Sequence, residues 1–236
     1  MSKNSFQFKQ FTVNQERCAM KVGTDGTLLG AWARVYNKYP RILDIGTGTG
    51  LIALMMAQRY PQAIVVGIDI DMDAVLQAQE NVAASPFANR IMINKIDITN
   101  FSDEEGYDAI VCNPPFFVDA LTCPGEQRTL ARHTVTLNYN SLIHSARKLL
   151  KNDGCLSVII PVDNKDNIDF AIAIEGLFVT RVCQIKTTPN KLPKRLLIEI
   201  KKTPAYDVDF QEEILESLPG HRSDWYREIT KEFYIK

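Results

Sequence analysis

Residues 41–60 read RILDIGTGTGLIALMMAQRY: an apolar run, a turn with three glycines, and a second apolar run that ends at Pro61. Residues 41–46 predict a buried strand, and residues 51–60 predict a helix. Glycines in a strand-to-helix turn let the backbone approach a bound ligand closely, and the helix that follows offers free N–H groups. The stretch therefore predicts a βα unit with a ligand site at its turn.

The rest of the chain repeats this alternation. Further strands are predicted at 63–70, 90–97, 107–113, 155–161, 178–187 and 195–203, and helices at 73–84, 138–150 and 167–177. Strands that alternate with helices favour parallel pairing and a three-layer α/β sandwich. The last two strands predict a hairpin, which adds an antiparallel edge. We expect a single domain: a seven-stranded, mostly parallel sheet (41–203) between an N-terminal extension (1–40) and a C-terminal extension (204–236).

Bulk composition excludes several classes of protein. The 236 residues carry a net charge of -1, so binding of nucleic acid would depend on local basic patches. The five cysteines are scattered without a CxxC pair or a Cys/His cluster, so we expect neither a disulfide framework nor a metal site. No apolar run approaches the roughly 20 residues that span a membrane. Since the N-terminus also lacks the apolar core of a signal peptide, we expect a cytoplasmic protein with no membrane contact.

Acidic residues recur at the predicted carboxyl ends of strands, where open α/β sheets bind ligands. Asp44 lies two residues before Gly46, the first glycine of the turn. The spacing G-x-G-x-G, which includes Gly48, differs from the fingerprint that binds a pyrophosphate. An acid near the loop would repel phosphates but suits the ammonium of S-adenosylmethionine. Asp69 is placed to accept ribose hydroxyls, and Asp97 to meet the adenine amino group. Helix capping and turn formation are the alternative roles for these last two acids.

The sequence Asn113-Pro114-Pro115-Phe116 ends the fourth predicted strand in the same row. A planar amine stacked on Phe116 would donate its hydrogens to the Asn113 side-chain oxygen and the Pro114 carbonyl. Prolines stiffen the backbone, so these acceptors stay in place. Two acceptors would localise the nitrogen lone pair toward a methyl donor, and catalysis would rest on positioning and on oxygens that meet the developing charge. This predicts methyl transfer without a metal or a strong base.

DIGTGTG followed by NPPF resembles the Rossmann-like class I S-adenosylmethionine-dependent methyltransferases that act on planar amino groups. Residues 8–32, residues 131–143 and the terminal FYIK resemble the bacterial tRNA-valine N6-adenine methyltransferases, and the resemblance covers nearly the whole chain. It implies N6-methylation of an adenine in the anticodon loop of tRNA, next to the anticodon. It also implies that Thr24 and Gly26 close over the methionine end of the cofactor. By their positions in the family motifs, five residues are implied to contact the cofactor or the amine: Asp44, Gly46, Asp69, Asp97 and Asn113.

Two basic segments are candidates for contacts with RNA phosphates. One follows NPPF and contains Arg128, Arg132 and His133; the other, 186–202, contains Lys191, Lys194 and Arg195 among further lysines. A solvated hairpin tip is an equally good explanation of the second segment, since runs of charge often mark surface. His133 could instead cap the helix that follows. Because one chain supplies every predicted element, we expect a monomer.

The sequence leaves alternatives open. Phe116 stands where many N6-adenine enzymes have tyrosine, and NPPF is also similar to motifs of N2-guanine rRNA methyltransferases. A glutamine amide also fits such a pocket, which makes a protein glutamine N5-methyltransferase a second alternative. A non-enzymatic alternative is an RNA-binding chaperone that retains the fold.

Overall fold

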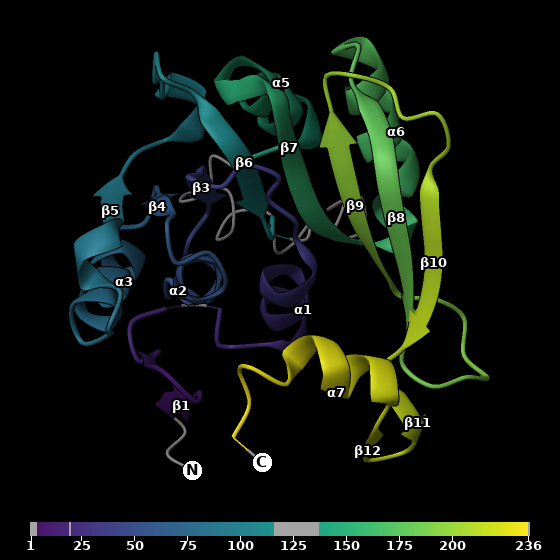
Figure 1. Cartoon of the computed structure of the whole chain (residues 1–236), viewed down its shortest axis with the longest axis horizontal. Helices are drawn as coiled ribbons and strands as arrows, with labels where there is room; N and C mark the ends of the chain where they lie inside the picture. The colour runs from purple at the N-terminus through teal and green to yellow at the C-terminus, as the bar shows by residue number, and fades with distance from the viewer. Residues whose placement is uncertain (1–3, 19, 116–136, 236) are drawn as a thin grey trace, which may run out of the picture.

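The computed structural model describes residues 4–18, 20–115 and 137–235. The strands of its central sheet are β3 (Arg41–Ile45), β4 (Ile64–Asp69), β5 (Ile91–Lys95), β6 (Tyr107–Cys112), β7 (Leu150–Pro161), β8 (Phe178–Lys186), β9 (Arg195–Lys201) and β10 (Asp209–Ile214). Their order across the sheet is β10-β8-β9-β7-β6-β3-β4-β5 (Figure 1). β9 pairs antiparallel with β7 and β8, and the other pairings in this sheet are parallel. The predicted mostly parallel sheet with an antiparallel C-terminal hairpin is therefore confirmed.

The C-terminal extension adds an eighth strand to the seven that the sequence predicts. β10 pairs in parallel with residues 181–186 of β8 and forms one edge of the sheet. Its sequence, DFQEEI, carries three acids, and its side chains are exposed or half-buried. Edge strands tolerate such charges, which also discourage pairing with another chain. For this reason β10 lacks the apolar pattern that identifies the interior strands.

Helices cover both faces of the sheet (Figure 1). One face packs against α1 (Thr24–Trp32), α2 (Leu51–Arg59) and α3 (Met72–Ala83), and the other against α5 (Tyr139–Leu149) and α6 (Lys165–Ile174). Neighbouring strand residues alternate between the two cores, so Ile42 packs on the α1–α2 side and Leu43 on the α5–α6 side. Strands buried on both faces explain the near-continuous apolar runs in the sequence. No helix in the described part of the chain has the length and apolarity that a bilayer crossing requires.

The two ends of the chain pack against each other. The hairpin of β1 (Ser5–Gln7) and β2 (Thr12–Asn14) lies beside the residues that follow α7 (Asp224–Thr230). Phe8 forms an antiparallel bridge with Tyr234, their rings stack at 5.8 Å, and the Lys9 N–H donates to the Phe233 carbonyl at 2.8 Å. A short hairpin of β11 (Glu216–Leu218) and β12 (His221–Arg222) precedes α7. The N-terminal and C-terminal extensions thus stabilise each other.

One buried amide connects the N-terminal hairpin to the glycine turn. Asn81 of α3 accepts the Asn14 N–H at 2.9 Å and donates to the carbonyls of Asn14 and Thr49 at 2.8 and 2.9 Å. Next along the chain, the Gln15 side-chain oxygen accepts the Val22 N–H at 2.7 Å. These bonds fix the path of the chain between β2 and α1.

Candidate active site

A pocket of about 660 Å³ lies at the carboxyl ends of β3, β4, β5 and β6. This volume lies within the usual range for sites that bind small molecules and cofactors. The pocket is lined by these residues predicted from the sequence: Thr24, Gly26, Gly46, Gly48, Asp69, Asp97, Asn113 and Pro114. Segments far apart in the sequence therefore meet at the carboxyl ends of the parallel strands, where open α/β sheets bind their ligands.

Three glycines shape the turn between β3 and α2. Gly46, Gly48 and Gly50 have φ angles of 67°, 54° and 80°, a left-handed region that residues with a side chain rarely adopt. A Cβ on Gly46 would meet nothing within 4 Å, whereas a Cβ on Gly50 would lie 3.3 Å from the Cβ of Ala78. The first two glycines line the pocket, and the third allows α2 and α3 to pack closely.

Asp44 lies beneath this turn and is fully buried. Its Oδ2 accepts the Thr47 hydroxyl at 2.7 Å and the Ala53 N–H at 3.1 Å, while its Oδ1 has no hydrogen-bond partner within the part of the chain that the structure describes. Burial raises the pKa of this carboxyl to about 7, against the opposing effect of its two hydrogen bonds. Asp44 is not among the residues that line the pocket. In this structure it holds the glycine turn, and its predicted contact with a cofactor stays a prediction.

The other two strand-end acids face the pocket. Asp69 accepts the N–H of Gly48 at 2.9 Å and the N–H of Asp71 at 3.0 Å, one on each carboxylate oxygen. Asp97 accepts the N–H and the hydroxyl of Thr99 at 2.9 and 2.8 Å. Asp97 therefore caps the 3-10 helix Ile98–Asn100, and Asp69 forms a local turn with Asp71, which are the roles of the alternative interpretation; Asp69 also holds the glycine turn. Because a carboxylate offers about four lone-pair sites, each acid retains capacity for a ligand hydroxyl or amine.

Asn113 presents an unsatisfied acceptor at the end of β6. Its side-chain oxygen is buried and has no hydrogen-bond partner among the described residues, although Asn113, Pro114 and Pro115 all line the pocket. A buried polar atom without a partner costs about 1–3 kcal/mol, and natural proteins rarely accept this cost without a functional reason. The predicted stacking residue, Phe116, lies outside the described residues.

The segment before α1 forms one wall of the pocket. Residues 20–26 all line it, which is consistent with an N-terminal extension that closes over a ligand. The sequence did not single out these further lining residues: Cys18, Met20, Asn138 and Ser141. Of these, Asn138 was recognisable as a helix cap, since its side chain accepts the Ser141 N–H at 2.8 Å. Burial, with Asp71 and other nearby acids, raises the pKa of the Cys18 thiol to about 11, so this thiol is a poor nucleophile.

The predicted RNA-binding residues have different surroundings. Arg128, Arg132 and His133 lie outside the described residues. Lys191 and Lys194 are exposed in the connection between β8 and β9. Arg195 begins β9, and its Nε lies 2.8 Å from Oδ2 of Asp25 in the pocket wall.

The other lysines of segment 186–202 have partners within the protein. Lys186 pairs with Glu212, Lys201 lies 3.7 Å from Glu199, and Lys202 donates to the Leu150 carbonyl. Only part of this basic segment is therefore available to a phosphate backbone.

The chemistry of the pocket suits a ligand with positive charge and hydroxyl groups. The described lining residues include the acids Asp25, Asp69, Asp71 and Asp97 and one base, Lys21. The ammonium, sulfonium and ribose of S-adenosylmethionine match this set, whereas a pyrophosphate would meet acids instead of basic side chains. Within the described residues, no group of three or more His, Cys, Asp or Glu side chains is arranged to hold a metal ion.

Comparison with known proteins identifies the class. Residues 33–180 match the family model "Methyltransferase small domain". A predicted O-methyltransferase from Agrobacterium tumefaciens has a similar structure, with a TM-score of 0.66 over 89% of this chain and 96% of that one; at 19% identity, this similarity shows the fold alone. The fold is that of a class I methyltransferase, the class that uses S-adenosylmethionine as methyl donor.

Two relatives define the group more closely. A protein from Phocaeicola vulgatus is 50% identical over 98% of this chain and 97% of its own length, and one from Parabacteroides distasonis is 47% identical over the full length of both chains. Both are named tRNA1(Val) (adenine(37)-N6)-methyltransferase. The chain belongs to the tRNA1(Val) (adenine(37)-N6)-methyltransferase family, and the resemblance noted in the sequence is confirmed.

Proposed function

We propose that this protein transfers a methyl group from S-adenosylmethionine to N6 of the adenine that follows the anticodon in a valine tRNA. The substrate is inferred from the names of the relatives, which match nearly the whole chain. The buried and unpaired oxygen of Asn113, beside the glycine turn, is the observation that supports the chemistry most directly.

Three parts of the pocket would hold the cofactor. Asp69 would accept the ribose hydroxyls, and Asp97 would meet the adenine end, since both line the pocket. Gly46 and Gly48 would leave room for the backbone to approach the ligand. The first turn of α1, with Thr24, would close over the methionine end. When bound, the cofactor supplies an electrophilic methyl group on a sulfonium.

Asn113 and Pro114 would orient the amine of the target base. The hydrogens of the amine would be donated to the Asn113 side-chain oxygen and the Pro114 carbonyl, and Phe116 would stack on the ring. The nitrogen lone pair would then form the N–C bond as the C–S bond breaks, and the displaced proton would pass to solvent. Oxygens already in place stabilise the positive charge that develops on nitrogen, and the fixed positions of the two reactants lower the barrier further.

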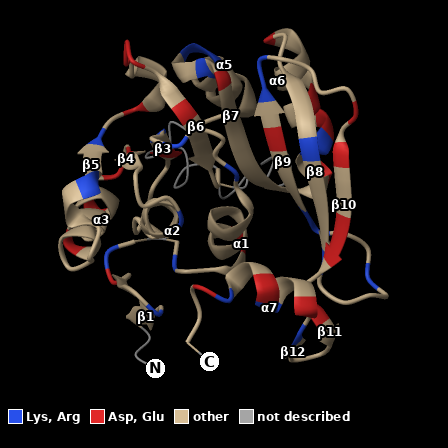
Figure 2. Cartoon of the chain, in the orientation of Figure 1, with Lys and Arg blue, Asp and Glu red and all other residues tan. Residues whose placement is uncertain are grey.

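The RNA would approach from the side of the β8–β9 connection. Lys191 and Lys194 are exposed there and would contact phosphates, with Arg128, Arg132 and His133 as further candidates. β10 and α7 carry several acidic residues (Figure 2), and the residues that follow β10 hydrogen-bond to Lys186 and Thr187 at the start of this connection, so RNA phosphates would contact the lysines and avoid these acids. A single-stranded anticodon loop lets the target base leave its stack at low cost. No second copy of the chain is needed for this arrangement, so we propose a monomer.

Incubation with labelled S-adenosylmethionine and separate RNA and protein substrates tests this function. The expected result is label in valine tRNA as N6-methyladenine, with none in ribosomal RNA or protein. Label recovered as N2-methylguanine or in a protein glutamine would instead support one of the two alternative enzymes. RNA binding without any transfer would support the chaperone.

A further inference from the structure

An ion pair joins the wall of the pocket to the antiparallel strand. Nε of Arg195, the first residue of β9, lies 2.8 Å from Oδ2 of Asp25, in the first turn of α1. Both side chains are partly buried, with 30% and 21% of their surface exposed. We propose that Asp25 and Arg195 are a positioning pair that holds the first turn of α1 against the cofactor, so that Arg195 acts on cofactor affinity. This inference rests on the proposed cofactor site.

The first turn of α1 packs on α2, where a Cβ on Gly26 would lie 3.2 Å from the Leu51 side chain, but it has few polar anchors among the described residues. The helix has nine residues, and its N-cap, Gly23, makes no side-chain capping bond. A helix this short is marginally stable unless tertiary contacts fix it. Near this end, Thr27 donates its N–H and hydroxyl to the Gly23 carbonyl at 3.3 and 3.1 Å, which are bonds within the same turn. The Arg195 contact is the ion pair that ties this turn to the sheet.

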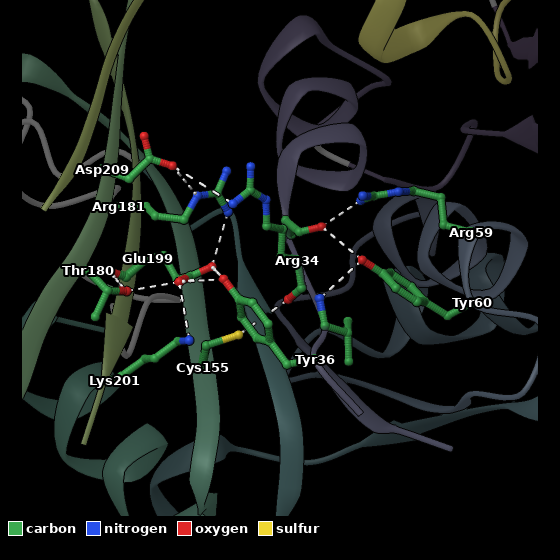
Figure 3. A network of polar contacts seen from close by, with 12 residues as sticks. Arg34, Tyr36, Arg59, Tyr60, Cys155, Thr180, Arg181, Glu199, Lys201 and Asp209 are labelled. Carbon is green, nitrogen blue, oxygen red and sulfur yellow. Dashed lines mark hydrogen bonds and ion pairs between the residues drawn. The ribbon is translucent and has the colours of Figure 1, made fainter. Parts of the chain in front are cut away.

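The opposite end of α1 is anchored to the same part of the sheet. The guanidinium of Arg181 lies 4.1 Å from the ring of Trp32, and Arg181 pairs with buried Glu199 at 3.1 Å. The Tyr36 hydroxyl donates to Glu199 at 3.1 Å, and Figure 3 shows this ring and Lys201 approaching the same carboxylate. Since one end of α1 is fixed by this network, removal of the Asp25 ion pair would free the pocket end selectively.

The pair is placed where small movements affect the ligand. Thr24, Asp25 and Gly26 are consecutive and all line the pocket. Arg195 is also held by the sheet, because it pairs with Pro161 of β7 and Ile185 of β8. The sheet is therefore the fixed side of the ion pair, and the turn of α1 is the side that it positions.

Calorimetric titration of S-adenosylhomocysteine into the RNA-free protein tests the proposal. Asp25→Asn, Arg195→Met and the double variant should each bind about tenfold more weakly than the native protein, a change of about 1.4 kcal/mol. The double variant should be no worse than either single one, because contacting residues are non-additive. The exchange Asp25→Arg with Arg195→Asp should recover part of the affinity. At saturating cofactor, Arg195→Met should leave KM for tRNA unchanged.

A matched ion pair far from the pocket provides the control. Arg41 and Asp103 also lie 2.8 Å apart, with 22% and 18% of their side chains exposed, and neither lines the pocket. Arg41→Met and Asp103→Asn should therefore lower thermal stability without changing the affinity for S-adenosylhomocysteine.

Several results would overturn the inference. Unchanged affinity in Arg195→Met with a higher KM for tRNA would make Arg195 an RNA contact. Weaker binding in Asp25→Asn alone would make Asp25 a direct ligand contact. Failure of the native protein to bind S-adenosylhomocysteine would instead reject the proposed cofactor site itself.

Discussion

The carboxylate of Asp69 accepts the backbone N–H of Gly48 at 2.9 Å, so the end of β4 fixes the turn that follows β3. A residue predicted to bind the ribose thus also shapes the glycine turn. We expect Asp69→Ala to weaken the binding of S-adenosylhomocysteine by about 100-fold, or about 3 kcal/mol, since hydrogen bonds to a charged group contribute roughly 1.5–3 kcal/mol each. Calorimetry measures this directly. Asp73→Asn, in the same region but outside the pocket lining, should bind normally, and equal losses in the two variants would argue against a ribose contact.

Substitution of Asn113 should slow methyl transfer without weakening the binding of the cofactor. Asn113→Ala removes the unpaired oxygen at the end of β6, and we expect the single-turnover rate to fall by about 10²–10³-fold, as when one preorganised polar group is removed from an active site. Cofactor affinity should stay within about threefold of the native value, because the oxygen is assigned to the amine of the substrate. Rapid-quench kinetics at saturating tRNA and cofactor measures the rate. A normal rate in this variant would remove the chemical basis of the proposed function.

Lys191 and Lys194 should contribute to RNA affinity through charge. Replacing both by alanine should raise KM for tRNA and reduce the slope of log affinity against log salt by about 2, or about one for each phosphate that a lysine no longer neutralises. Lys38→Ala is a suitable control, because Lys38 is exposed near the amino end of β3, whereas the pocket lies at the carboxyl end of this strand. Filter binding across a salt series gives both quantities. An unchanged salt slope would show that these lysines belong to a solvated hairpin tip.

Asp44 should make stability depend on pH. Its pKa is about 7 in the folded protein and 3.8 in the reference state, so folding favours the protonated carboxyl. The stabilisation is complete below the unfolded pKa and is lost as pH rises through the folded pKa. We expect the unfolding free energy to fall by about 3 kcal/mol between pH 5 and 8, relative to Asp44→Asn. Urea denaturation of the ligand-free proteins at several pH values provides the comparison, and parallel curves would contradict the raised pKa.

The strand-end residues were predictable from sequence because parallel strands place their carboxyl ends in one row. Asp69 and Asn113 each come at the end of an apolar run, and Asp97 follows the mixed segment IMINKI, so strand assignment alone brought them together. The start of β7 was harder to predict from the sequence. The residues KNDG at 151–154 resemble a turn, yet the strand begins at Leu150 and pairs irregularly with β6 at this end.

Contacts between distant segments could not be predicted in the same way. Asp25 and Arg195 are 170 positions apart, and neither has a local pattern that indicates a partner. Only the family resemblance, which implied roles for Thr24 and Gly26, indicated that the segment 20–26 contacts the cofactor, because the segment has no strong periodicity. Likewise, β10 was missed because an edge strand with charged side chains looks like a loop. Each of these features depends on tertiary packing that a single sequence does not encode locally.

The bridge between Phe8 and Tyr234 has a consequence for biosynthesis. The ribosome translates the N-terminal hairpin long before it reaches Phe233 and Tyr234. Domains generally fold as units during synthesis, from the N-terminal side onward. In this chain the contacts of Phe8 and Lys9 with Tyr234 and Phe233 form only after residue 234 has been translated, whereas the bonds between Asn81 and Asn14 can form earlier. A nascent chain stalled before residue 233 would then hold a formed central sheet with an N-terminal hairpin that lacks these aromatic and backbone partners.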